Sequence, residues 1–127
     1  MPFSREYTAV ETDIDELGHV NNAVYLRWIQ DIAAAHWYAV ASEAAQAEFV
    51  WVVSRHEIDY RAPTMAGEAL TVSTWIGTPK GARFDRFVKI EGPDGIVRAE
   101  AKTIWVMMDR ALMRPARIRK EIYEPFL

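Results

Sequence analysis

The pattern of apolar and polar positions predicts one long buried helix in the first half of the chain. Residues 23–47 contain no glycine or proline and are rich in alanine, which favours a continuous helix. Apolar side chains cover most of the helical circumference, and Arg27, Gln30 and Asp31 leave only a narrow polar stripe. A helix with so little polar surface must be buried on most of its sides.

Alternating and β-branched runs on both sides of this helix predict strands. One strand is expected before the helix and four after it, at residues 3–10, 49–60, 70–76, 84–90 and 96–109. The sequence Gly-Pro-Asp-Gly at residues 92–95 predicts a hairpin turn between the last two strands. This order predicts an α+β fold in which one antiparallel sheet of about five strands wraps one long central helix. Because an open sheet has free edges, we expect a second copy to extend it in a homodimer or homotetramer.

Composition narrows the classes of function. The 127 residues suffice for a single domain over residues 1–127. Fifteen basic and eighteen acidic side chains give a formal net charge of −3, which argues against a nucleic-acid partner. The chain has no cysteine, which excludes a disulfide framework and a cysteine nucleophile. No apolar run is long enough for a signal peptide or a membrane span, so we expect a cytoplasmic protein with no membrane partner.

The polar segment before the predicted helix, residues 12–22, carries the candidate chemistry. It combines three carboxylates, a histidine, a glycine and two asparagines. A solvated loop has the same composition, with Asn21 or Asn22 as the cap of the helix. However, the first turn of a helix offers unpaired amides and the positive end of the dipole, which together stabilise an oxyanion. A carboxylate beside those amides would complete a site for acyl transfer, and Gly18 can take a positive φ that lets a substrate approach.

The segment from Asp13 to Trp28, which reads DIDELGHVNNAVYLRW, resembles the signature of hot-dog-fold thioesterases. These enzymes include the 4-hydroxybenzoyl-CoA thioesterase-like acyl-CoA hydrolases, and the plant acyl-ACP thioesterases carry a related segment. Weaker similarity covers most of the chain, including residues 60–63 and 67–68. The resemblance implies a sheet curled around a central helix and hydrolysis of an acyl-CoA to a free acid and CoA. It implies no cofactor, because CoA is part of the substrate.

The same resemblance assigns roles to residues of the segment. Asp15 matches the catalytic carboxylate, which acts either as a nucleophile or as a general base for water. The backbone amide near Asn22 is implied as the oxyanion donor. Asp13, Gly18 and His19 match positions that shape or support the loop. A direct catalytic role for His19 is the second choice, because histidine titrates near neutrality.

Two features bear on the carrier of the acyl group. In the plant acyl-ACP enzymes an asparagine lies two residues after the catalytic aspartate, whereas this chain has Leu17 there. This departure favours single-carboxylate chemistry and CoA over a carrier protein. Lys80, Gly81 and Arg83 lie between two predicted strands, where the family often contacts the phosphates of CoA, although a solvated turn would look the same.

Other interpretations remain open at the level of sequence. A hot-dog hydratase or dehydratase would act on similar acyl thioesters, and a non-catalytic dimer would bind an acyl group or CoA without turnover. The acyl chain length and the choice between aromatic and aliphatic groups are not determined. No metal site is expected, because too few potential metal ligands come together in the loop. His36 and His56 are expected to be packed rather than catalytic.

Overall fold

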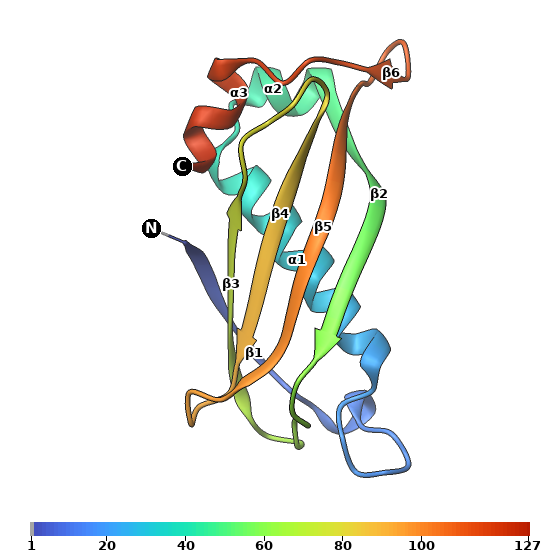
Figure 1. Cartoon of the computed structure of the whole chain (residues 1–127), viewed down its shortest axis with the longest axis vertical. Coiled ribbons are helices and arrows are strands. Elements are labelled where there is room, and N and C mark those ends of the chain that lie inside the picture. The colour runs from blue at the N-terminus through green and yellow to red at the C-terminus, as the bar shows by residue number, and fades with distance from the viewer. Residues whose placement is uncertain (1) are drawn as a thin grey trace.

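The computed structural model describes residues 2–127, in which a long helix lies across one face of a twisted antiparallel sheet (Figure 1). The strands are β1 (Phe3–Thr8), β2 (Phe49–Tyr60), β3 (Ala69–Ile76), β4 (Arg83–Glu91), β5 (Val97–Asp109) and β6 (Arg114–Pro115). The helices are α1 (Asn22–Val40), α2 (Glu43–Glu48) and α3 (Lys120–Tyr123), with short 3-10 turns η1 (Glu11–Asp13) and η2 (Glu124–Phe126). The strand order is β1-β3-β4-β5-β2, and β6 pairs with the end of β5.

The strands confirm the predicted pattern. β2 spans the predicted residues, and β3, β4 and β5 begin and end within one residue of the prediction. On β3, the alternate residues Leu70, Val72 and Thr74 are fully buried. β1 ends two residues earlier than predicted. It does so because the Val10 amide donates to the carboxylate of Asp13 instead of to a neighbouring strand.

The prediction of one continuous helix over residues 23–47 is wrong, because the helix breaks at Ala41 and Ser42. Ala41 is extended, with φ −76° and ψ 145°. The Ser42 hydroxyl then accepts a hydrogen bond from the Ala45 amide at 3.1 Å and caps α2. A serine side chain satisfies the free amides of a new first turn, which favours a fresh start over continuation. The break redirects the chain so that α2 leads directly into β2.

Helix α1 buries the side that faces the sheet. Its buried residues are Val24, Tyr25, Trp28, Ile29, Ile32, Ala33, His36 and Trp37. The predicted polar stripe of Arg27, Gln30 and Asp31 is exposed. Tyr38 is exposed as well, to 65%, so the helix is less enclosed in the single chain than its apolar pattern predicts.

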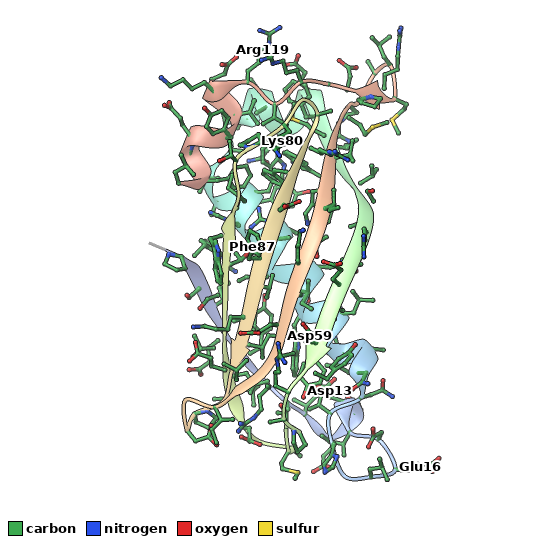
Figure 2. All side chains as sticks on the ribbon, viewed as in Figure 1. Asp13, Glu16, Asp59, Lys80, Phe87 and Arg119 are labelled. Atoms are coloured by element: carbon green, nitrogen blue, oxygen red, sulfur yellow. The ribbon has the colours of Figure 1, made fainter. Side chains whose placement is uncertain are left out.

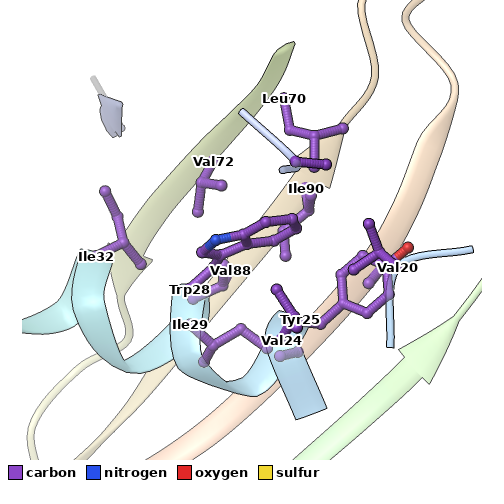
Figure 3. Packing of buried hydrophobic residues seen from close by; sticks show 13 residues of the cluster. Val20, Val24, Tyr25, Trp28, Ile29, Ile32, Leu70, Val72, Val88 and Ile90 are labelled. Carbon is purple, nitrogen blue, oxygen red and sulfur yellow. The ribbon is translucent and has the colours of Figure 1, made fainter. Parts of the chain in front are cut away.

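The core has two parts along the helix. Around the first half of α1, Trp28, Ile29 and Ile32 pack against inward side chains of β3 and β4, as Figure 3 shows. Around its end, Trp37 packs with Phe126 and other aromatic residues of a second cluster. Within residues 2–127, no helix combines the length and apolar character needed to span a membrane.

Candidate active site

A closed loop between β1 and α1 holds the residues predicted to carry chemistry. Ile14 and Val20 form an isolated bridge at its base, and the Asp15 amide donates to the His19 carbonyl at 2.8 Å. At the tip, Gly18 has φ +79° and its amide donates to the Asp15 carbonyl at 3.1 Å. Glycine takes this left-handed conformation without the steric cost that a Cβ would bring. The loop is therefore a hydrogen-bonded turn that fixes the backbone of Asp15.

Asp13 anchors this loop to its surroundings. Its buried carboxylate accepts hydrogen bonds from the Val10 amide at 3.0 Å and from the Arg27 guanidinium at 2.9 Å. Its carbonyl accepts from the Asn21 amide at 2.8 Å. Burial by itself raises the pKa of Asp13, but the Val10 and Arg27 hydrogen bonds outweigh it, so the pKa lies below its usual value. Asp13 thus ties the end of β1 to the start of α1, which suits a supporting role.

Asp15 is half-buried, and only one of its two carboxylate oxygens accepts hydrogen bonds from the loop. Oδ1 accepts from the Leu17 amide at 2.9 Å and from the His19 amide at 3.3 Å. Among the described residues, none donates to Oδ2. The side chain is therefore oriented by one oxygen and retains a second that is available to a substrate or a water.

The start of α1 presents a free backbone amide. Asn21 is the cap, as one of the two predicted choices, and its side chain accepts from the Ala23 amide at 2.9 Å. The Val24 amide donates to the Asn21 carbonyl at 2.9 Å. Between them, the Asn22 amide has no acceptor among residues 2–127, as expected for the first residue of a helix. It is a hydrogen-bond donor at the positive end of the helix dipole.

Asp15 and Asn22 line the same open cleft of about 510 Å³. Its other walls come from the loop, the helix, the end of β2 and the segment after β2, namely Leu17, His19, Val20, Asn21, Tyr25, Tyr60, Arg61, Ala62 and Pro63. A carboxylate and an unpaired amide on the walls of one cleft are the elements that hydrolysis of an acyl group requires.

The end of β2 and the segment after it were not predicted to belong to the site. Tyr60 and Arg61 line the cleft, and the Tyr60 hydroxyl donates to the Asn22 carbonyl at 3.4 Å. Thr64 is fully buried, where its carbonyl accepts from the Val20 amide and its hydroxyl from the Tyr25 hydroxyl, both at 2.8 Å. The resemblance over residues 60–63 was the only signal in the sequence that pointed to this segment.

The turn with Lys80, Gly81 and Arg83 lies far from the Asp15 loop. Arg83 pairs with Val106 of β5, whereas Tyr60 of the cleft pairs with Ala99 of β5. Seven residues of a strand correspond to roughly 23 Å. Figure 2 shows Lys80 near one end of the molecule, and Asp13 and Glu16 of the loop at the other. One chain alone therefore does not bring this turn to the cleft.

The two remaining histidines are packed, as predicted. His36 is 4% exposed, stacks on Phe3 with ring centroids 4.7 Å apart, and accepts from the Arg86 guanidinium. His56 is half-buried and Nδ1 lies 2.8 Å from the Thr103 hydroxyl. Burial lowers the pKa of both, for His36 to about 4 with a further contribution from the charge of Arg86. Neither histidine lines the Asp15 cleft.

A family model described as acyl-ACP thioesterase N-terminal domain matches residues 1–126. The chain belongs to this family. It is a thioesterase of the hot-dog type, and both the resemblance of the loop segment and the predicted sheet around one long helix are confirmed. No curated protein sequence matches the chain.

Solved structures show the same fold at low sequence identity. A hypothetical protein from Staphylococcus aureus in complex with CoA is 15% identical with a TM-score of 0.89, over 98% of this chain and 81% of that one. A 1,4-dihydroxy-2-naphthoyl-CoA thioesterase from Synechocystis is 18% identical with a TM-score of 0.83, over 99% and 96%. A thioesterase from Thermus thermophilus complexed with coenzyme A and zinc is 23% identical with a TM-score of 0.84, over 97% and 90%. At these identities the likeness establishes the hot-dog fold alone.

Proposed function

We propose that this thioesterase hydrolyses acyl-CoA to a free carboxylic acid and CoA, with Asp15 as its catalytic carboxylate. The observation that carries the proposal is that the unpaired amide of Asn22 and the unpaired Oδ2 of Asp15 belong to residues of one cleft. The amide N–H would donate a hydrogen bond to the carbonyl oxygen of the thioester as negative charge develops on it. The carboxylate would attack the carbonyl carbon itself or activate a water that attacks it.

Two routes use this arrangement. In the first, Asp15 attacks the carbonyl carbon, the carbon–sulfur bond breaks, CoA leaves as the thiol after protonation, and water hydrolyses the resulting mixed anhydride. In the second, Asp15 takes a proton from a water that attacks the carbonyl carbon, and CoA leaves as its sulfur takes up a proton. Both routes consume one water per thioester and return Asp15 to its starting state. The loop hydrogen bonds to Oδ1 leave Oδ2 for either role.

Support for CoA as the carrier comes from two structural neighbours. The Staphylococcus aureus and Thermus thermophilus proteins each hold CoA. Leu17 in place of the asparagine of the plant acyl-ACP enzymes points the same way. The family description names an acyl carrier protein, so the two carriers need a direct comparison.

We also propose that a single hot-dog domain acts as a homodimer or higher assembly. β2 lies at an edge of the sheet, where its backbone groups are free to pair with a second copy. A symmetric antiparallel pairing of β2 with β2 would place each end of one chain beside the opposite end of the other. Such a pairing would place the Lys80 turn of a second copy at the same end of the dimer as the Asp15 cleft of the first.

The test compares Asp15→Asn with Glu16→Gln, because Glu16 is an exposed carboxylate in the same loop. Thiol release is measured over short, long and aromatic acyl-CoAs and over the same acyl groups on an acyl carrier protein. Asp15→Asn should lose turnover while CoA binding persists, and Glu16→Gln should behave as the wild-type chain. Undiminished hydrolysis by Asp15→Asn would remove the assignment of Asp15. Hydration of enoyl-CoA without thiol release, or binding without turnover, would replace the proposed reaction.

A further inference from the structure

A second cavity lies at the other end of α1 and is not part of the Asp15 cleft. It encloses about 320 Å³ between the second half of α1 and the inner faces of β2, β4 and β5. Its walls are largely aromatic and include Trp37, Phe49, Trp51, Phe84, Trp105 and Phe126. Arg86 and Arg110 also line it, and none of its lining residues is acidic. We call this cavity the Arg86 pocket.

Arg86 is a buried cation without an anionic partner. It sits on the buried face of β4 between Phe84 and Val88 and is 2% exposed. Its Nη1 donates to His36 Nδ1 at 2.9 Å and to the Thr74 hydroxyl at 3.0 Å, and both of these acceptors are neutral groups. Among residues 2–127, no carboxylate forms an ion pair with it.

The other buried arginine, Arg98, has the carboxylate partners that Arg86 lacks within the described part of the chain. Arg98 is 5% exposed and forms ion pairs with Glu68 at 2.8 Å and Asp94 at 3.2 Å. Arg86 instead has aromatic rings around it, with its guanidinium carbon 5.6 Å from the centre of Phe84 and 5.3 Å from that of Phe126. Cation–π contacts compensate only part of the cost of burying a charge.

Burial lowers the pKa of Arg86 to about 9, so the side chain stays charged at neutral pH but in an unfavourable environment. A carboxylate is the group that matches the planar fork of a guanidinium, with two parallel charge-assisted hydrogen bonds. An anion in the pocket would therefore restore to Arg86 the kind of partner that Arg98 already has.

Further donors at the pocket also lack acceptors. Arg86 Nε, Trp51 Nε1 and Trp105 Nε1 are buried and have no hydrogen-bond partner among the described residues. All three belong to side chains that line the pocket. Buried N–H groups in native proteins are nearly always paired. A wall with a cation, unpaired donors and no acidic residue is complementary to a ligand that brings acceptor oxygens and a negative charge.

We propose that the Arg86 pocket binds a small apolar carboxylic acid, with the carboxylate on Arg86 and the apolar body against the aromatic walls. The flat ring walls and the volume favour an aromatic body. The pocket shares no lining residue with the Asp15 cleft. Ala33 and Trp37 of the pocket lie 11 and 15 residues after Asn22 on α1, which is roughly 16–22 Å along the helix. Within one chain the Arg86 pocket is therefore separate from the Asp15 cleft, and the ligand proposed for it is a free acid, the class of compound that the proposed thioester hydrolysis releases.

Benzoate and benzamide provide the test on the wild-type chain, because they share a shape and differ in charge. Binding is measured by calorimetry and by the indole N–H signals of the five tryptophans in an NMR spectrum. Benzoate should bind at least about tenfold more tightly than benzamide, a difference of about 1.4 kcal/mol. It should shift the signals of Trp51 and Trp105 and leave that of Trp75, on the outer face of the sheet, in place. Equal affinity for the two compounds, or shifts that spare Trp51 and Trp105, would overturn the proposal.

Variants then test whether Arg86 is the cation that binds the carboxylate of benzoate. Arg86→Met should lose the preference for benzoate, whereas Arg117→Met, at an exposed arginine away from the pocket, should keep it. If Arg86→Met does not fold, Arg86→Lys decides, since it keeps the charge without the fork and should bind benzoate more weakly than the wild type. Wild-type affinity in both Arg86 variants would contradict the assignment.

Asp15→Asn separates this inference from the proposed function, because it should bind benzoate like the wild type while it loses turnover. If Asp15→Asn loses benzoate binding, the two sites are not independent and the inference fails. If it keeps turnover, the proposed role of Asp15 fails and the benzoate results stand.

Discussion

Replacing Asn22 with proline removes the backbone N–H proposed as the oxyanion donor and perturbs the helix little. Asn22 is the first residue of α1, the helical position at which proline is best tolerated, because its N–H has no partner within the helix. The preceding residue, Asn21, has ψ 138°, an extended conformation that proline favours in the residue before it. The Asn22 carbonyl, which accepts from the Tyr60 hydroxyl, is kept. The substitution therefore tests a single hydrogen-bond donor.

The expected loss follows from what one such donor contributes. Removal of one donor from an oxyanion site lowers kcat by roughly 100- to 1000-fold, about 2.7–4 kcal/mol of transition-state stabilisation. The free energy of unfolding should change by less than about 1 kcal/mol, since Asn22 is exposed and its amide makes no intramolecular hydrogen bond. Asn22→Ala is the matched control, because it removes the side chain and keeps the amide.

The assay is thiol release at saturating acyl-CoA, with CoA affinity measured separately to detect a block of the cleft by the proline ring. Asn22→Pro should lower kcat with little change in CoA affinity, and Asn22→Ala should retain most of the wild-type kcat. The reasoning is refuted if Asn22→Pro folds and keeps a kcat close to that of the wild type. An equal loss in Asn22→Ala would move the role from the amide to the side chain.

Three further predictions concern stability. Asp13→Asn should lower the free energy of unfolding in denaturant by about 1–3 kcal/mol, because the buried acceptor loses the charge that pairs with Arg27. Tyr25→Phe should cost about 1–2 kcal/mol in the same assay, since it leaves the buried Thr64 hydroxyl without its donor. The pKa of His36 lies at about 4 instead of 6.5, so the unfolded chain binds a proton there more readily than the folded one. The stability that neutral His36 gives the folded chain is therefore complete above pH 6.5 and is lost as the pH falls to about 4. The free energy of unfolding should fall by on the order of 3 kcal/mol over this range, and His36→Gln should make this fall smaller.

A specific result would contradict each of these three predictions. Wild-type stability of Asp13→Asn would mean that the loop does not depend on its charged anchor. A neutral effect of Tyr25→Phe would mean that Thr64 finds another donor. An unchanged slope between pH 6.5 and 4 in His36→Gln would assign the titration to another group.

Local interactions let the sequence determine several features of this protein. The cap at Asn21 and the turn at Gly18 depend on atoms within a few residues, so side-chain type and spacing were enough to predict them. The strand limits followed from alternation with a period of two, which reports which side of a strand meets the core. The resemblance over residues 13–28 identified the family before any tertiary contact was known.

The tertiary structure decided what depends on contacts between distant residues. Thr64 binds Tyr25 across 39 residues and Arg86 binds His36 across 50, and no local pattern encodes either pair. The alternation of β4 places Arg86 on the buried face, but only the packed sheet and helix show that no carboxylate meets it there. The distance of the Lys80 turn from the cleft arises in the same way. The sequence determined which polar and charged side chains are present. The packing of the helix across the sheet determined which of them come into contact, because the pairing energies of distant residues depend on the whole packed arrangement.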